Sequence, residues 1–175
     1  MLLSFGIIMV MGSFQGLVLP VHFTETGAPA DLGYVLSAMS AGLLVGSLGY
    51  TALAPRLKRR TWYVVSLAGM AVGVAVMGLL PPLWLLLAAA LLLGMSAGPA
   101  SALMGFFAFD RIPNQNRGSA LGTQNAIVLV VAPVAVFATS VVVEWLGVGI
   151  GALALAACWL AITVWATATR SMRGI

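Results

Sequence analysis

The most regular feature of this sequence is a succession of long apolar runs separated by short polar breaks. Six runs contain no charged residue, and they occupy residues 1–21, 32–54, 62–80, 83–108, 119–142 and 147–169. A helix needs about 20 apolar residues to cross a hydrocarbon core about 30 Å thick. In lipid the backbone must satisfy its own hydrogen bonds, which favours helices. The pattern therefore predicts an all-α membrane protein with six transmembrane helices in a single domain, residues 1–175.

The charges in the polar breaks predict the orientation of these helices. If every run crosses the membrane, the breaks alternate between its two sides. All eight Lys and Arg residues then lie on one side, and four of them belong to the stretch PRLKRR, residues 55–60. The opposite side receives His22, Glu25, Asp31 and Glu144. Because cytoplasmic loops are enriched in Lys and Arg, we predict a plasma-membrane protein with both termini in the cytoplasm.

Composition narrows the class of protein and of partner. The chain is 62% hydrophobic and 7% charged, whereas an average soluble domain is about 25% charged. A net charge of +4 suggests nucleic acid as one partner to consider. Nucleic-acid modules, however, spread their basic residues along a solvated face, and here those residues occupy short breaks between apolar runs. We therefore expect membrane lipid and not nucleic acid as a partner.

The sequence gives little support to an enzymatic function. His22 and Glu25 are three residues apart, but a metal site needs three or four ligands and the chain has one His and one Cys. No Gly-x-Ser-x-Gly elbow or Gly-rich nucleotide loop occurs. We expect no catalytic residue, no metal and no cofactor. The lone Cys158 is expected to be a small buried apolar side chain.

Small residues recur at four-residue spacing within the runs. Such stripes allow helix backbones to approach closely in lipid, and they comprise Gly12/Gly16, Ala38/Gly42/Gly46, Gly69/Gly73 and Gly94/Gly98. Six helices also divide into two triplets of opposite orientation, residues 1–80 and 83–169. Inverted repeats of three plus three helices are common in transporters, so the fold is predicted to contain one.

Three segments show a resemblance to a known family: GSLGYTALAPRLKRRTW (46–62), LGMSAGPA followed by FDRIPNQNRGSALG (93–100 and 109–122), and LPVHFTETGAPADLGYVLSAMSAGLLVGS (19–47). In order and spacing they resemble the C-terminal six-helix half of a Major Facilitator Superfamily transporter, nearest the multidrug and siderophore exporters. Arg56, Arg59 and Arg60 match basic positions of the loop between the second and third helices. Pro55 stands where the family has Asp.

The resemblance implies a second role for the cytoplasmic charges beside orientation. In the family, arginines of this loop pair with carboxylates and helix C-termini and latch one conformation. Asp110 is the one carboxylate on the predicted cytoplasmic side, so it is the expected partner within the chain. The residues assigned to gate and topology are Arg56, Lys58, Arg59, Arg60, Asp110, Arg111 and Arg117.

The resemblance also points to a substrate pathway, because the first, second, fourth and fifth helices of each half line the cavity in related transporters. The uncharged polar candidates on these helices are Gln15, Tyr34, Ser37, Ser101, Gln124 and Asn125. Such a lining suits efflux of a hydrophobic or amphipathic small molecule by alternating access. Two alternatives stay open. In the first, each of these polar groups serves only helix packing. In the second, the chain is a non-transporting six-helix scaffold or assembly subunit.

The same resemblance implies a partner, since the family's working unit has two six-helix halves. The first run has no basic n-region or cleavage site, so we expect a retained helix and not a signal peptide. Its abrupt start indicates that the natural protein extends further. The chain is then a fragment, a split-gene half or a subunit, and it is expected to pair with a second half or with itself as a homodimer.

Overall fold

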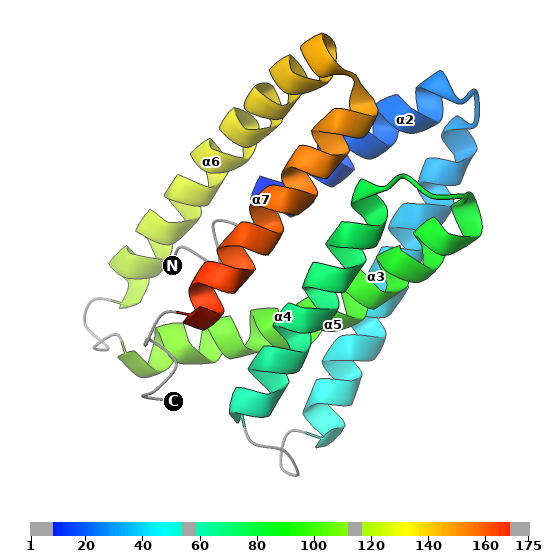
Figure 1. The fold of residues 1–175 in the computed structure, drawn as a ribbon. Coiled ribbons are helices and arrows are strands. Elements are labelled where there is room, and N and C mark those ends of the chain that lie inside the picture. Colours follow the sequence, from blue (N-terminus) through cyan, green and yellow to red (C-terminus); the bar gives the residue numbers. More distant parts are fainter. Residues whose placement is uncertain (1–8, 54–58, 112–116, 169–175) are drawn as a thin grey trace.

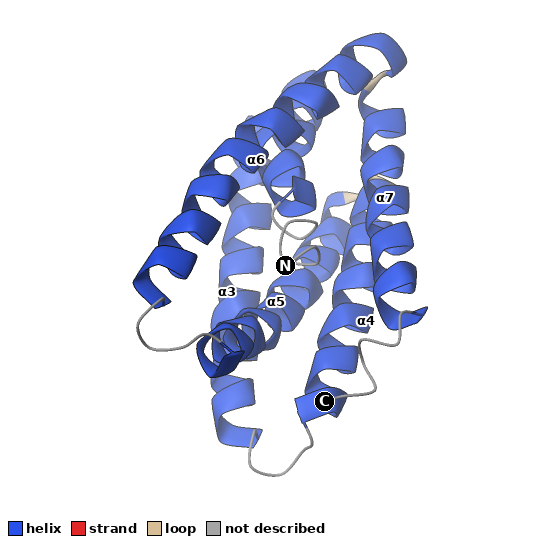
Figure 2. Cartoon of the chain, turned by 90° about the vertical axis from the view of Figure 1, so that its left-hand side faces the viewer, coloured by secondary structure: helices blue, strands red, loops and turns tan. Residues whose placement is uncertain are grey.

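A computed structural model describes residues 9–53, 59–111 and 117–168, and Figures 1 and 2 show these segments as helices joined by short connections. The elements are the π-helical turn η1 (Phe14–Val18) and the α-helices α2 (Leu19–Glu25), α3 (Pro29–Leu53), α4 (Arg59–Gly78), α5 (Leu83–Arg111), α6 (Arg117–Leu146) and α7 (Val148–Ala168). The described residues contain no strand. The predicted all-α class is thus confirmed.

Four of the described helical segments are long and apolar enough to cross a membrane: Pro29–Leu53, Thr61–Gly78, Leu83–Ala102 and Asn125–Leu146. A shorter apolar helix covers Val148–Val164. At about 1.5 Å per residue, the four longer segments match a hydrocarbon core about 30 Å thick. The structure therefore supports a multi-pass membrane protein.

The first helix, residues 9–25, changes its winding in the middle. Residues 9–13 are α-helical, Phe14–Val18 form the π turn, and α2 continues to Glu25. The backbone N–H of Leu19 donates to the carbonyl of Phe14, five residues earlier. Pro20 has no N–H, and in a regular α-helix its ring would clash with the carbonyl of Gly16. The wider turn accommodates this proline without ending the helix.

Short turns join the helices at one end of the bundle (Figure 1). Gly27 follows α2 with φ 72° and Gly147 follows α6 with φ 85°. A left-handed residue after a helix end closes the last turn, and glycine adopts it without steric cost. The N–H of Gly147, for example, donates to the carbonyl of Val143 at 2.8 Å.

The closest packing joins α3 to α5, which also contacts α4 and crosses both helices obliquely (Figure 1). A Cβ atom added at Gly42 would collide with the carbonyl oxygen of Leu91, and one at Gly94 with that of Met39. Gly98 is equally confined, since its Cβ would lie 2.8 Å from the backbone nitrogen of Ser47. The glycine stripes predicted on these two helices therefore form a single backbone-to-backbone contact.

The stripe Gly12/Gly16 behaves differently from the others. A Cβ at Gly12 would meet nothing within 4 Å, and one at Gly16 would lie 3.7 Å from Cγ2 of Val136, an ordinary contact. The expectation of close backbone packing along this stripe was wrong. The first helix meets its neighbours through larger side chains instead, among them the buried Val10, Phe14 and Val18.

The core lies between the first helix, α4, α5 and α7, and it includes Leu67, Met70, Leu93 and Trp159. Trp159 is fully buried, whereas its neighbour Cys158 is exposed. The expectation that Cys158 is buried was therefore wrong. Helix α7 directs the tryptophan to the core, and the next residue on a helix lies about 100° away.

Candidate substrate pathway

Gln15 lies in the π turn and is partly buried. Its Nε2 donates a hydrogen bond to Sδ of Met39 in α3 at 3.5 Å. A thioether is a weak acceptor, and an amide group has two N–H donors and one carbonyl acceptor. No other hydrogen bond of this side chain occurs among the described residues. Gln15 thus contributes a polar group with spare hydrogen-bonding capacity where the first helix meets α3.

A second polar contact joins the first helix to α6. Oγ1 of Thr139 lies 3.1 Å from Oγ of Ser13 and 2.8 Å from the carbonyl oxygen of Ala135. A threonine hydroxyl has one proton, and the shorter contact places it on the carbonyl. The Ser13 hydroxyl then donates to Thr139. Both side chains are buried, so this pair is an internal hydrogen bond between the first helix and α6.

Helix α3 presents a row of polar side chains on its exposed side. Tyr34 is 63% exposed, and Ser37 is exposed one turn further along. The structure adds three residues that the sequence reasoning passed over: Ser40, Ser47 and Thr51, all exposed. Their spacing of three, seven and four residues from Ser37 onward is a helical periodicity and was the signal available in the sequence.

The hydroxyls of this row share one bonding pattern. Ser40 donates to the carbonyl of Leu36 at 2.9 Å, Ser47 to that of Leu43 at 2.7 Å, and Thr51 to that of Ser47 at 2.9 Å. Each hydroxyl thereby uses its proton within the helix and keeps lone pairs that can accept a further hydrogen bond. The exposed Leu44 and Leu48 lie between them. We call residues 34, 37, 40, 44, 47, 48 and 51 the open face of α3.

The remaining pathway candidates belong to α5 and α6. Ser101 is exposed on α5 and donates to the carbonyl of Gly98 at 2.8 Å. Asn125 is exposed near the start of α6. The side chain of Gln124 lies outside the described part. No hydrogen bond joins Ser101 or Asn125 to another candidate within that part, where the cross-helix bond made by a predicted residue is that of Gln15.

Those of the predicted gate residues whose backbone the structure describes lie at the opposite end from the short turns. Arg56 and Lys58 lie outside the described residues. Arg59 and Arg60 begin α4, Asp110 and Arg111 end α5, and Arg117 begins α6. Beside the PRLKRR stretch, the rings of Tyr50 and Trp62 meet edge to face with centroids 5.5 Å apart. This aromatic pair joins α3 and α4 across the basic loop.

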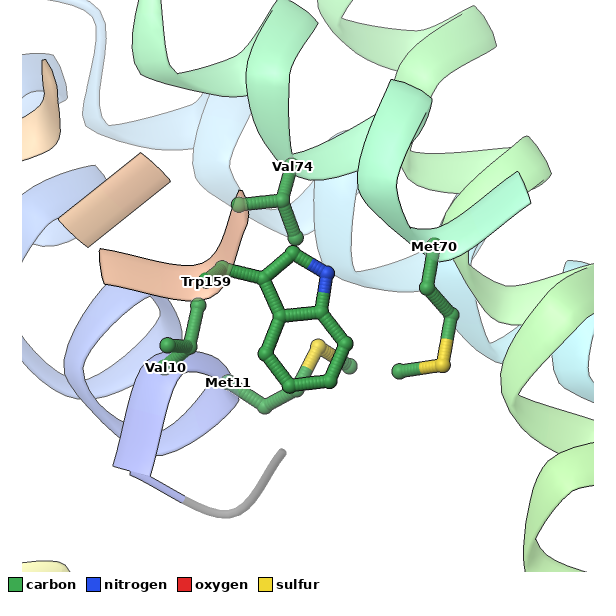
Figure 3. Close-up of a pocket in the computed structure, with 5 residues that line it drawn as sticks. All are labelled: Val10, Met11, Met70, Val74 and Trp159. Atoms are coloured by element: carbon green, nitrogen blue, oxygen red, sulfur yellow. The ribbon is translucent and has the colours of Figure 1, made fainter. Parts of the chain in front are cut away.

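A groove of about 210 Å³ runs between the first helix, α6 and α7. Small residues widen it, namely Ala135, Ala138, Gly151 and Ala154, and Cys158 lies on its α7 wall. The neighbouring space around Trp159 is filled instead. Figure 3 shows Val10, Met11, Met70 and Val74 packed around the indole ring. The helices therefore pack without free space beside Trp159 and leave a groove beside Cys158.

The acidic and histidine side chains that the structure describes lie at one end of the bundle. Among the side chains that the structure describes, Asp, Glu and His occur only as His22, Glu25, Asp31 and Glu144, next to the short turns. Within this same set no group of three or more His, Cys, Asp or Glu residues comes together as a metal site. The described helix surfaces thus offer a solute hydroxyls, amides, aromatic rings and aliphatic groups.

Comparison with known proteins agrees with this membrane bundle. A family model described as Major Facilitator Superfamily matches residues 1–173. The chain is 29% identical over 132 residues to the multidrug efflux pump Tap of Mycolicibacterium fortuitum, covering 75% of this chain and 32% of the pump. It is 27% identical over 142 residues to the multidrug efflux pump Tap of Mycobacterium tuberculosis, covering 81% of this chain and 34% of the pump.

The Tap pump of Mycobacterium bovis matches to the same extent, 27% over 142 residues. The chain therefore spans about a third of the length of these curated relatives. No solved structure matches it. Because the family model covers nearly the whole sequence and the relatives are efflux pumps, the resemblance inferred from the loops is confirmed: this chain belongs to the Major Facilitator Superfamily of membrane transporters.

Proposed function

We propose that this chain is the C-terminal six-helix half of an efflux transporter that moves hydrophobic or amphipathic small molecules by alternating access. The observation that carries the proposal is the open face of α3, which combines apolar side chains with hydroxyl groups on the same helix that Gln15 contacts through Met39. The similarity to pumps named for multidrug efflux supports the same direction of transport.

The proposed architecture has six spanning helices: the first helix, α3, α4, α5, α6 and α7, arranged as an inverted repeat of three plus three in one domain, residues 1–175. The described turns at one end and the basic stretches at the other support this arrangement. We place the basic end, with both termini, in the cytoplasm on the positive-inside rule. Glu25, Asp31 and Glu144 then lie on the side of the membrane opposite the cytoplasm.

The chemistry of the open face suggests which solutes bind there. Ser40, Ser47 and Thr51 use their protons within α3, so a solute meets acceptor lone pairs between leucine side chains. A molecule with an apolar body and N–H or O–H donors satisfies both features. Strong anions would meet acceptors without a compensating charge. We therefore propose amphipathic amines and related donors as the substrate class, with Gln15 and Gln124 as the first residues to test.

The second half of the transporter is the proposed partner. Helix α6 exposes large apolar side chains along its length, from Leu129 to Trp145, and the open face of α3 carries polar groups that lipid cannot satisfy. A second six-helix half would cover both surfaces and enclose the solute between the halves. A homodimer would do so less completely, because both halves would then present the same faces. The basic loop and Asp110 are proposed to latch the cytoplasmic side in one state.

Accumulation assays test the proposal. Cells would express this chain with the six-helix half encoded upstream of it or beside it, and a fluorescent amphipathic amine would report uptake. We expect lower steady-state accumulation than in cells expressing either half alone, and the difference should vanish when the membrane is de-energised. Unchanged accumulation across a varied panel, with both halves present in the membrane, would contradict efflux and favour a scaffold role.

A further inference from the structure

The π turn of the first helix lies where that helix changes its packing partners. On the N-terminal side, Val10 and Met11 pack against Trp159 of α7 and Val74 of α4 (Figure 3), and Ser13 bonds to Thr139 of α6. On the C-terminal side, α2 packs on α3. The first helix therefore belongs to two groups of helices, and η1 lies at the boundary between them.

The two polar contacts beside this boundary differ in strength. The Ser13–Thr139 bond joins two buried hydroxyls at 3.1 Å. The Gln15–Met39 bond joins a partly buried amide to a thioether at 3.5 Å, and sulfur is the weaker acceptor. A motion that separates the two groups of helices would therefore break the contact to α3 first and keep the contact to α6.

Two glycines at this boundary have no packing reason to be glycine. Gly12 precedes the π turn and Gly16 lies within it, and an added Cβ would meet nothing within 4 Å at Gly12 and only an ordinary contact at Gly16. Close packing explains Gly42, Gly46 and Gly94 elsewhere, but it does not explain this pair. What glycine does provide is a backbone that resists bending less than alanine does.

We propose that η1 is a hinge of the first helix, with Ser13 as its anchor to α6 and Gln15–Met39 as the contact that opens. This hinge rests on the proposed alternating-access function, to which it assigns a moving part. Each residue turns an α-helix by about 100°. Conversion of the π turn to α winding therefore shifts α2 by one residue relative to residues 9–13. Because α3 packs on α2, that rotation moves Met39 away from Gln15 and leaves Ser13 on Thr139.

Glycine-to-alanine variants test the hinge with matched controls. Gly12→Ala and Gly16→Ala add a methyl group where there is room. Gly33→Ala and Gly49→Ala do the same in α3, where an added Cβ also meets nothing within 4 Å. We expect the Gly12/Gly16 double variant to lower the transport rate about threefold to tenfold without a lower unfolding temperature. The α3 controls should stay within twofold of the parent. Equal rates in all variants would overturn the hinge.

Cross-linking separates the anchor from the opening contact. In a Cys158→Ala background, Ser13→Cys with Thr139→Cys fixes the anchor, and Gln15→Cys with Met39→Cys, joined by a short bifunctional thiol reagent, fixes the opening contact. We expect transport to survive the first link and to be lost with the second until the reagent is cleaved. The proposal would be overturned if transport were lost with the anchor link and survived with the Gln15–Met39 link, because the motion would then occur at the anchor.

Hydrogen exchange tests the hinge even if the chain transports nothing. In lipid nanodiscs, backbone amides of residues 15–19 should exchange about tenfold faster than those in the middle of α5, because the wide turn opens more easily. The Gly12/Gly16 double variant should slow this exchange, and Gly49→Ala should not. Uniform protection along residues 9–25 would overturn the hinge, whereas failure of the efflux assay alone would overturn only the proposed function.

Discussion

Gly94 of α5 lies directly against the carbonyl of Met39 in α3, with no room for a side chain between the two backbones. Because lipid gives no hydrophobic drive for helix association, contacts of this kind supply much of the packing energy in a membrane bundle. The same Met39 accepts the hydrogen bond from Gln15. One residue of α3 thus connects the tightest packing of the fold with the proposed pathway.

Gly94→Ala is expected to destabilise the fold. The added methyl would collide with the Met39 backbone, and overpacking of this kind costs about 1–3 kcal/mol. Thermal unfolding in detergent would show a lower midpoint. Gly149→Ala in α7 is the matched control, because a Cβ there meets nothing within 4 Å. Equal midpoints for both variants would contradict the close approach of α3 and α5.

Neutralising Arg56, Lys58, Arg59 and Arg60 together is expected to disturb the membrane orientation. These four residues are half of the basic residues in the chain, and positive charge is the main topological signal. Single cysteines at positions 58 and 144 in a Cys158→Ala background, labelled with an impermeant reagent, would report the sides. In the parent chain we expect labelling from outside at position 144 and not at position 58. Outside labelling of position 58 in the parent chain would refute the proposed topology.

Gln15→Ala is expected to change which compounds are exported. Loss of one hydrogen bond to a solute weakens binding by about 0.5–1.5 kcal/mol, or roughly 2- to 12-fold. Compounds with N–H donors should lose more than purely apolar ones. Thr24→Ala is a suitable control, since this exposed hydroxyl on α2 bonds to the carbonyl of Pro20 and lies outside the open face of α3. An unchanged export profile would remove Gln15 from the pathway.

Cys158 is expected to react with thiol reagents that partition into lipid. Its side chain is exposed on the wall of the groove between the first helix, α6 and α7. An apolar maleimide should label it within the membrane faster than a charged one, because the groove is lined almost entirely by apolar groups. Ala154→Leu would narrow the groove and slow the labelling. Equal rates with both reagents would indicate an aqueous path to this position.

The sequence predicted the helical class and the stripes of α3 and α5 because both depend on local features: long apolar runs, and glycine at four-residue spacing. It did not predict which face of each helix is buried. In water an apolar stripe marks the core, but a membrane helix is apolar on all sides. The exposed Cys158 beside the buried Trp159 illustrates this limit, since both are apolar residues on the same run.

The candidate site was predictable only in part, and for related reasons. Gln15 was found because a long polar side chain is conspicuous in an apolar run. Ser40, Ser47 and Thr51 were missed because their hydroxyls resemble ordinary helix-interior serines until the exposed side of α3 is known. The π turn depends on how the first helix accommodates Pro20 against its neighbours, and Pro20 marks an irregularity in sequence without specifying its form.

The two sides of α3 differ in how freely their residues can be replaced during evolution. On one side Gly42 and Gly46 touch the backbone of α5, so nearly any replacement there would damage the fold. On the other side Ser37 and Ser40 are exposed, and replacing them changes the exposed surface of α3 away from that contact. Under the proposed function, selection for new solutes would therefore alter the exposed side of α3 step by step while the helix keeps its place in the bundle.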